Sequence, residues 1–266
     1  MKLPYKDPNS HKGQKGKVIV IGGSAKYYGA PILTALGAEK AGADLINVYL
    51  PSEHMNTAKN YSLNLFLNPF HQENLSNHDV DKIIENANSC DAVVIGNGLD
   101  TNAETKLAII EILKLVKTNI VIDAEAIVPE ILSINSNGKW VLTPHQAEFK
   151  RLYGNDFTPV FAKEMAQKYN HTLCIKGKLD YVISEKSLYE NHTGCPEMRV
   201  GGTGDVLAGI IASYIAQGLE PLEACRSAIY YYGNAGIELN LKKNNFTAYD
   251  LIKFYPKYLA SIKHKF

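Results

Sequence analysis

The sequence lacks three features that would place it quickly in a familiar class of proteins. Its longest apolar runs fall well short of the roughly 20 residues that a membrane-spanning helix requires. Its charges nearly cancel, with 28 Lys and Arg against 27 Asp and Glu, and no basic block of the kind that binds nucleic acid is present. We therefore predict neither a membrane partner nor a nucleic-acid partner.

Cysteine is also scarce, and its spacing excludes the common cysteine frameworks. The four cysteines form no CxxC pair and are widely separated, at Cys90, Cys174, Cys195 and Cys225. A zinc site or a disulfide scaffold requires closer grouping. We interpret these residues as reduced thiols that pack as small apolar groups.

The N-terminal segment is polar and carries no targeting signal. No apolar segment precedes Val18, so neither a signal peptide nor a membrane anchor is expected. We interpret residues 1–16 as a loose arm. No repeat or linker interrupts the chain, which predicts a single domain over residues 1–266 of a cytoplasmic protein.

Short runs rich in Val and Ile predict buried strands in the first half of the chain. They lie at Lys17–Ile21, Leu45–Leu50, Asp91–Ile95, Asn119–Ile122 and Trp140–Leu142. Helices are predicted at Ala30–Ala41 and Asn102–Lys117, and each of the last three strands is expected to follow a helix. The second helix carries apolar residues at helical spacing, at Leu107, Ile110, Leu113 and Val116. This alternation predicts an α/β fold with a mostly parallel sheet covered on both faces.

The second half predicts a different pattern. Thr172–Lys176 and Tyr181–Ser184 are short strands, and Ser187–Glu190 is expected to pair with the second as a hairpin, which gives the sheet an antiparallel margin. Three helices are predicted to follow, at Thr203–Gln217, Pro221–Leu241 and Ala248–Ile262.

The strongest chemical motif is Gly201–Asp205 (GGTGD), which immediately precedes an apolar helix. The amides of Gly202, Thr203 and Gly204, together with the helix dipole, predict an anion site for nucleotide phosphates. A carboxylate beside phosphates costs Coulomb energy, so we interpret Asp205 as a base that accepts a proton from an attacking hydroxyl. The alternative is structural: Thr203 caps the helix and Asp205 favours its dipole.

A second motif, Thr143–Glu148 (TPHQAE), follows the strand at Trp140–Leu142. Ligands of open α/β sheets bind beyond the carboxyl ends of strands, which predicts a binding role for His145. Glu148 is interpreted as a residue that holds Mg²⁺ through water. The alternative is that Glu148 belongs to the first turn of a helix started by Pro144 and that His145 is structural.

Three further segments that leave strands are candidate ligand loops. They are Gly22–Ala30, Gly96–Leu99 and the segment formed by Lys176, Gly177, Lys178, Leu179 and Asp180. The first lacks the GxGxxG pattern of a dinucleotide-binding turn.

Together these segments resemble the ADP/ATP-dependent NAD(P)H-hydrate dehydratase family of the ribokinase-like superfamily. The resemblance extends from His11 to Leu251, and its motifs in order are GGSAKYYGAP, IGNGL, VIDAEAI, LTPHQAEF, IKGKLD and GGTGDVLAG. It implies a three-layer α/β/α sandwich and the conversion of hydrated NADH or NADPH (NADHX, NADPHX) to NADH or NADPH. ADP or ATP would be the co-substrate and Mg²⁺ the cofactor.

The resemblance also implies roles for individual residues. Ala30, Gly98, His145 and Asp205 would contact the hydrated nicotinamide nucleotide. The adenine nucleotide would be bound by the 176–180 segment and Gly204. A homotetramer and a separate NAD(P)HX epimerase as a functional partner are also implied.

The chain departs from the family pattern at five positions: Glu125, Asp180, Cys195, Arg199 and Val200. The choice between ADP and ATP, and between NADHX and NADPHX, stays open. The competing interpretations are a small-molecule kinase of the same superfamily, of the hydroxyethylthiazole or hydroxymethylpyrimidine type, and a non-catalytic nucleotide-binding module.

Overall fold

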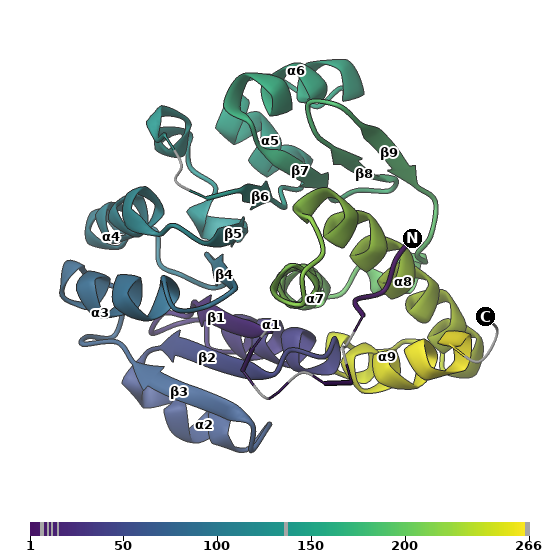
Figure 1. The fold of residues 1–266 in the computed structure, drawn as a ribbon, viewed down its shortest axis with the longest axis horizontal. Coiled ribbons are helices and arrows are strands. Elements are labelled where there is room, and N and C mark those ends of the chain that lie inside the picture. Colours follow the sequence, from purple (N-terminus) through teal and green to yellow (C-terminus); the bar gives the residue numbers. More distant parts are fainter. Residues whose placement is uncertain (6–7, 10, 12, 15, 136–137, 264–266) are drawn as a thin grey trace.

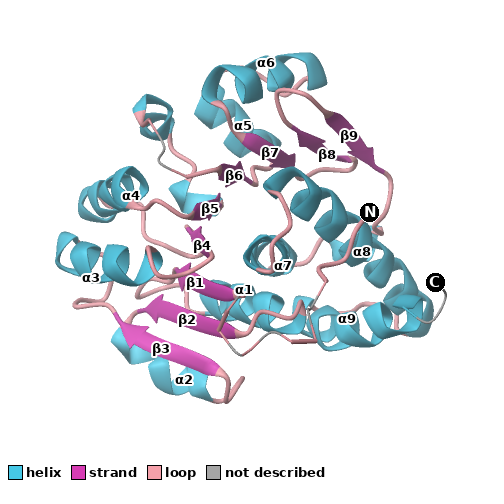
Figure 2. Ribbon diagram, viewed as in Figure 1, coloured by secondary structure: helices cyan, strands magenta, loops and turns pink. Residues whose placement is uncertain are grey.

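The computed structural model describes residues 1–5, 8–9, 11, 13–14, 16–135 and 138–263. Its centre is a nine-stranded sheet with the strand order β3-β2-β1-β4-β5-β6-β7-β8-β9 (Figures 1 and 2). The strands are β1 Lys17–Ile21, β2 Leu45–Leu50, β3 Leu65–Pro69, β4 Ala92–Ile95, β5 Asn119–Ile122, β6 Trp140–Leu142, β7 Thr172–Ile175, β8 Asp180–Ile183 and β9 Leu188–Asn191. Strands β1 to β7 are parallel and β8 and β9 are antiparallel, which confirms the predicted sheet and its margin.

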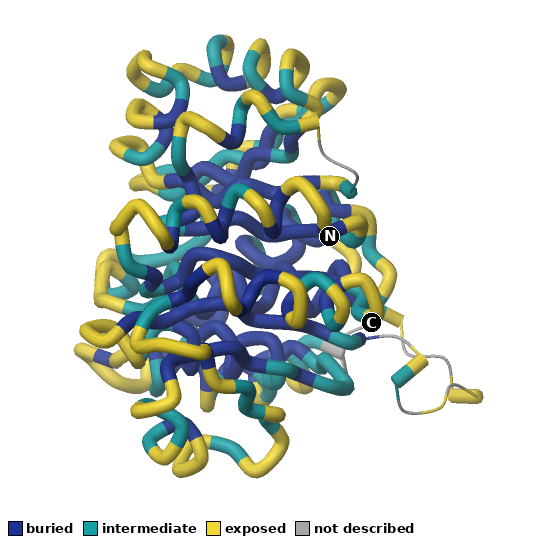
Figure 3. Tube along the Cα trace, turned by 90° about the vertical axis from the view of Figure 1, so that its left-hand side faces the viewer, coloured by how far each residue is buried: buried dark blue, intermediate teal, exposed yellow. Residues whose placement is uncertain are grey.

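Helices cover both faces of the sheet (Figure 1). They are α1 Gly29–Lys40, α2 Met55–Lys59, α3 Asn77–Ala87, α4 Ala103–Leu115, α5 Gln146–Tyr153, α6 Pro159–Tyr169, α7 Thr203–Ala216, α8 Pro221–Lys242 and α9 Ala248–Lys263. Val18 and Val20 of β1 belong to the apolar cluster on the side of α1, α7, α8 and α9, whereas Ile19 and Ile21 belong to the cluster on the side of α3 to α6. Because both faces are covered, the central strands are apolar at nearly every position, and the buried residues form the interior layers in Figure 3.

Helix α7 lies in the middle of one layer. All of its residues from Val206 to Ala216 are buried. Gly209 permits the close packing, since a Cβ there would lie 1.9 Å from the carbonyl oxygen of Thr34 in α1. The small residues of this segment therefore mark a central helix, as predicted.

The fold differs from the predicted elements in several places. The sequence did not predict β3, α2 or α6, and the connection from β5 to β6 has only 3₁₀ turns at Ala124–Ala126 and Pro129–Ser133 among its described residues, where a helix was expected. Helix α4 ends at Leu115, and its buried face is turned from the predicted one, because Leu107 is 57% exposed while Ala108 and Ile109 are buried.

The predicted loose arm is partly docked. The backbone N–H of Lys2 donates to Glu223 Oε1 (3.1 Å) and to Ser227 Oγ (3.0 Å), both in α8. The Tyr231 hydroxyl donates to the carbonyl of Met1 (3.1 Å). Residues 6–7, 10, 12 and 15 of this arm lie outside the described residues.

Among the helices described, none is long and apolar enough to cross a membrane.

Candidate active site

The site lies where the strand order changes direction, between β1 and β4. From β1 the sheet continues through β2 and β3 on one side and through β4 to β9 on the other. In such sheets a crevice opens outside the carboxyl ends of the two central strands. The loops after β1 and β4, together with the start of α7, form the walls of this crevice.

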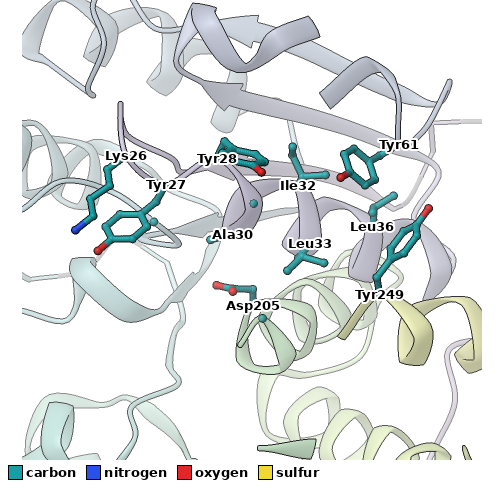
Figure 4. A pocket seen from close by; sticks show the side chains of 13 residues that line it. Lys26, Tyr27, Tyr28, Ala30, Ile32, Leu33, Leu36, Tyr61, Asp205 and Tyr249 are labelled. Atoms are coloured by element: carbon teal, nitrogen blue, oxygen red, sulfur yellow. The ribbon is translucent and has the colours of Figure 1, made fainter. Parts of the chain in front are cut away.

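A first cavity of about 500 Å³ occupies the crevice. Its walls include Ala30, Gly98 and Asp205, three of the four residues that the resemblance assigns to the nicotinamide nucleotide. Figure 4 shows Lys26 and Tyr27 at one end of this cavity and Tyr61 and Tyr249 at the other, with Asp205 between them. The rings of Tyr61 and Tyr249 meet edge to face with centroids 5.7 Å apart. The sequence motifs do not single out either tyrosine.

A second cavity of about 470 Å³ lies on the other side of the α7 start. Every residue from Lys176 to Asp180 lines it, and so do Thr203 and Gly204. The structure thus brings together all but one of the residues predicted to bind the nucleotide. The exception is Gly202, which lines the first cavity.

The first turn of α7 is the wall between the two cavities. Its N-cap is Gly202, whose φ of 94° lies in the left-handed region. The alternative in which Thr203 caps the helix is wrong, because its hydroxyl donates to the carbonyls of Met198 (2.9 Å) and Val200 (3.0 Å). Gly204 faces one cavity and Asp205 the other, so an anion site and a carboxylate are neighbours on one turn.

Asp205 is joined to a buried polar chain. The amide nitrogen of Asn97, in the loop after β4, donates to Asp205 Oδ1 (2.7 Å) and to Asp123 Oδ2 (2.9 Å). Asp123 Oδ1 in turn accepts from Lys176 Nζ (2.7 Å) and from the Thr143 hydroxyl (2.7 Å). A continuous chain of side chains therefore runs from the first cavity to the second.

The chain exists because the ends of β4 and β5 approach closely. Gly96 has a φ of 126°, and a Cβ there would lie 1.8 Å from the carbonyl oxygen of Asp123. No other residue fits this contact. Asn97 is fully buried and Asp123 is 2% exposed, so both carry their polar groups in the interior.

Burial sets the protonation behaviour of Asp205. Desolvation and then the nearby carboxylate of Asp123 raise its pKa to about 6, against the opposing hydrogen bond from Asn97. For Lys176, burial opposes the charge, but the carboxylates of Asp123 and Glu148 outweigh it and raise its pKa. Near neutral pH the site therefore holds a cation beside the second cavity and a weakly basic carboxylate beside the first.

His145 and Glu148 line neither cavity and instead cap α5. His145 is the N-cap, and its Nδ1 accepts from the backbone N–H groups of Ala147 and Glu148 (3.1 Å each). Glu148 Oε2 accepts from the backbone N–H of His145 (2.8 Å), which completes a capping box. The helix begins after His145 rather than at Pro144. Thus the structural interpretation of His145 has a concrete basis.

Asp180 supports the turn at the second cavity. Its Oδ1 accepts from the backbone N–H of Gly177 (3.0 Å) and its Oδ2 accepts from the Asn191 side chain (3.3 Å). Burial raises the pKa of Asp180. This carboxylate holds the loop in shape. Cys195 and Arg199, which like Asp180 depart from the family pattern, also line the second cavity.

Within the part of the chain that the structure describes, no three His, Cys, Asp or Glu side chains gather as a metal site.

All four cysteines are free thiols. Cys174 and Cys225 are buried, as expected for apolar packing groups, and Cys90 and Cys195 are partly exposed.

Two residues of the polar chain were not selected from the sequence as site residues, although both lie in motifs that were noted. Asn97 is in the IGNGL motif, and Asp123 directly follows β5 in the VIDAEAI motif. An acidic residue at the carboxyl end of a central strand was the signal available for Asp123.

Comparison with known sequences gives a consistent family. The NAD(P)H-hydrate dehydratase family matches residues 18–257. The chain is 39% identical over 268 residues to a bifunctional NAD(P)H-hydrate repair enzyme of Hyperthermus butylicus, covering 94% of this chain and 49% of that protein. It is 33% identical over 266 residues to an ADP-dependent (S)-NAD(P)H-hydrate dehydratase of Nitrosopumilus maritimus, covering 94% of this chain and 90% of that protein. The chain spans about half the length of the bifunctional relatives it matches.

Solved structures share the fold. A ribokinase-like superfamily protein of Enterococcus faecalis superposes with a TM-score of 0.87 at 25% identity, covering 97% of this chain and 92% of that one. An ADP/ATP-dependent NAD(P)H-hydrate dehydratase of Bacillus subtilis, co-crystallized with ATP/Mg²⁺, superposes with a TM-score of 0.83 at 24% identity, covering 97% and 94%. The predicted ribokinase-like fold is confirmed.

Proposed function

The chain belongs to the NAD(P)H-hydrate dehydratase family, and from this premise we propose that it converts NADHX and NADPHX to NADH and NADPH at the expense of ADP or ATP. One observation supports this most directly. A single turn of α7 presents Gly204 to one cavity and Asp205 to the other. A phosphoryl donor and a hydroxyl acceptor bound in these cavities would meet at that turn.

The chemistry requires a better leaving group than hydroxide. Transfer of a phosphoryl group to the hydroxyl oxygen of the hydrated ring makes that oxygen a good leaving group, and the electron pair of the ring nitrogen then expels phosphate. Loss of a proton from the neighbouring ring carbon to solvent restores the ring double bond, so that water is removed overall. Asp205 accepts the hydroxyl proton during the transfer. The amides of Gly202, Thr203 and Gly204, with Lys176, stabilise the charge on the transferred group.

We place the nicotinamide nucleotide in the first cavity and the adenine nucleotide in the second. The apolar and aromatic wall formed by Tyr27, Leu33 and Tyr249 suits the ring of the substrate. The second cavity offers the ammonium groups of Lys176 and Lys178 to phosphates. His145 keeps its assignment to the nicotinamide nucleotide as a prediction, separate from its role as a cap.

Mg²⁺ suits the same site as an ion that arrives with the nucleotide. It keeps several waters and is held by one or two carboxylates together with substrate phosphates, so it requires no preformed cluster. Asp123 and Glu148 are the carboxylates that raise the pKa of Lys176, which lines the second cavity. Glu148 would hold the ion through water, and the ion would neutralise phosphate charge.

We also propose the single domain and the cytoplasmic location that the sequence predicts. The family resemblance further implies a homotetramer and an NAD(P)HX epimerase as the functional partner, and we propose both. Gel filtration with light scattering measures the oligomer directly.

One assay tests the reaction. Purified protein is incubated with NADHX, Mg²⁺ and either ADP or ATP, and the near-ultraviolet absorbance of reduced nicotinamide is followed. Recovery of NADH with release of phosphate is expected. A stable phosphorylated product without NADH would instead identify a kinase, and no nucleotide turnover at all would identify a binding module.

A further inference from the structure

Asn97 occupies an unusual position between two carboxylates. It is fully buried, and its single amide nitrogen donates one hydrogen to Asp205 and the other to Asp123. The two bonded partners lie 108 and 26 positions away in the sequence. Its own carbonyl oxygen Oδ1 has no partner among the described residues. A buried amide that leaves one polar atom unpaired costs stability, which points to a functional reason for this residue.

Two neighbouring carboxylates without such a bridge tend to share one proton. Each raises the pKa of the other, and the pair then titrates as a unit. Here the two amide hydrogens give each carboxylate its own donor. Asp123 is further fixed by Lys176 Nζ and the Thr143 hydroxyl (2.7 Å each). Both carboxylate oxygens of Asp123 thus accept hydrogen bonds from fixed donors. Asp205 accepts from Asn97 and lines the first cavity, where it can exchange a proton with a ligand.

We infer that Asn97 is a positioning residue for the proposed reaction, which orients the Asp205 carboxylate toward the substrate and ties it to the Asp123–Lys176 ion pair on the nucleotide side. The amide engages Oδ1 of Asp205, and the carboxylate faces the first cavity (Figure 4). The base and the cation beside the phosphates are thereby fixed relative to each other through three hydrogen-bonded contacts. This inference rests on the proposed function.

The groups that face Asp205 come from four elements. They are Asp123 after β5, Lys176 after β7, Glu148 in α5 and Tyr232 in α8. Asp123 and Glu148 disfavour its charge and Lys176 favours it. Removal of the Asn97 donor leaves these groups in place. The pKa of Asp205 should therefore rise when the hydrogen bond from Asn97 is removed.

The test substitutes Asn97→Leu, which keeps the approximate volume and removes both donors. The acidic limb of the turnover profile should move up by about one pH unit, with the nucleotide KM nearly unchanged. The matched control is Thr105→Val, which removes another buried hydrogen bond, from the Thr105 hydroxyl to the carbonyl of Leu75 (2.8 Å). Thr105 lines neither cavity. A limb that stays in place in Asn97→Leu, or that moves equally in Thr105→Val, overturns the inference.

A second measurement does not depend on activity. Asp205→Asn is made in the wild-type and Asn97→Leu backgrounds, and urea unfolding is followed from pH 4 to pH 9. The stability gap between Asp and Asn at position 205 grows with pH until the carboxylate is fully charged. That plateau should be reached about one pH unit later without Asn97. Equal profiles in both backgrounds contradict the inference, even where the dehydratase assay itself fails. Asn97→Ala replaces Asn97→Leu if the leucine variant does not fold.

Discussion

Lys176 and Asp123 form a 2.7 Å ion pair beside the start of α7. Asp123 is 2% exposed, and a Cβ at Gly204 would lie 3.4 Å from Lys176 Nζ. The pair therefore contributes to the stability of the buried site and places a cation beside the second cavity. Folding stability and nucleotide binding can be measured separately.

Lys176→Met should weaken both stability and nucleotide binding. It leaves the Asp123 carboxylate buried without its cation, which costs about 3–5 kcal/mol of unfolding free energy. The nucleotide KM should rise about 10-fold or more, since a charge-assisted contact to phosphate is lost. Urea unfolding and steady-state kinetics measure the two effects. Lys178→Met is the control: this exposed lysine lines the same cavity, so it should change KM while stability stays the same.

Asp205→Asn should abolish most of the turnover and spare nucleotide binding. Loss of general-base assistance lowers kcat by roughly 10²–10⁴-fold, while the amides of the α7 start remain. Turnover of NADHX and calorimetric binding of ADP are the measurements. Asp156→Asn, a change at an exposed loop residue paired with Lys150, should leave both values as in the wild type. Full activity of Asp205→Asn would remove this residue from the mechanism.

The pH dependence of the wild-type enzyme should show an acidic limb near pH 6. The base must be unprotonated, and burial together with Asp123 raises the pKa of Asp205 to about 6. Turnover should therefore fall as the pH drops below this value. The pH profile of kcat/KM for NADHX, which reports the pKa values of the free enzyme, tests this. A limb near the ordinary aspartate value, about 4, would contradict it.

The same carboxylate should destabilise the folded protein at neutral pH. Its pKa is raised from 3.8 in the unfolded chain to about 6 in the fold. The stability from its protonated form is thus fully present below pH 3.8 and is lost as the pH rises through 6. Asp205→Asn should be more stable than the wild type by about 1–3 kcal/mol at pH 8, and this gain should shrink below pH 6. Equal stability at all pH values would exclude the raised pKa.

His145 allows the cap to be separated from a substrate contact. His145→Ala removes the acceptor for two backbone N–H groups of α5 and should cost about 1 kcal/mol. His145→Asn restores an N-cap and should restore stability. If His145 also contacts the nicotinamide nucleotide, both variants raise the substrate KM. A normal KM in the asparagine variant would leave the cap as the function of His145.

Much of the fold could be predicted from local patterns. The predicted bounds of β1, β2, β5 and β6 match the structure, because strands covered on both faces show as short, mostly apolar runs. Strand β3 escaped prediction because it is the sheet edge: Phe66 is exposed, and Asn68 and Pro69 interrupt the pattern. Local periodicity carries no signal for such a strand.

Sequence motifs predicted most residues of the candidate site, but they did not predict the contacts between their side chains. GGTGD indicated an anion site, and the residues that the resemblance selected mostly line the two cavities. The Asp205–Asn97–Asp123 chain could not be read from spacing, because it depends on the approach of two strand ends at Gly96. The capping geometry of His145 could not be predicted from spacing either. A histidine before a helix can bind a ligand or cap the helix, and only the folded structure shows that Nδ1 accepts from two backbone N–H groups of α5.

The first turn of α7 separates two cavities that have no lining residue in common. With the two ligands placed as proposed, neither occupies the cavity of the other, so neither must leave before the other arrives. Steady-state kinetics should accordingly follow a sequential scheme with random order of addition, with double-reciprocal lines that intersect. Product release should be similarly independent, so that reduced nicotinamide leaves from one side of the helix and spent nucleotide from the other.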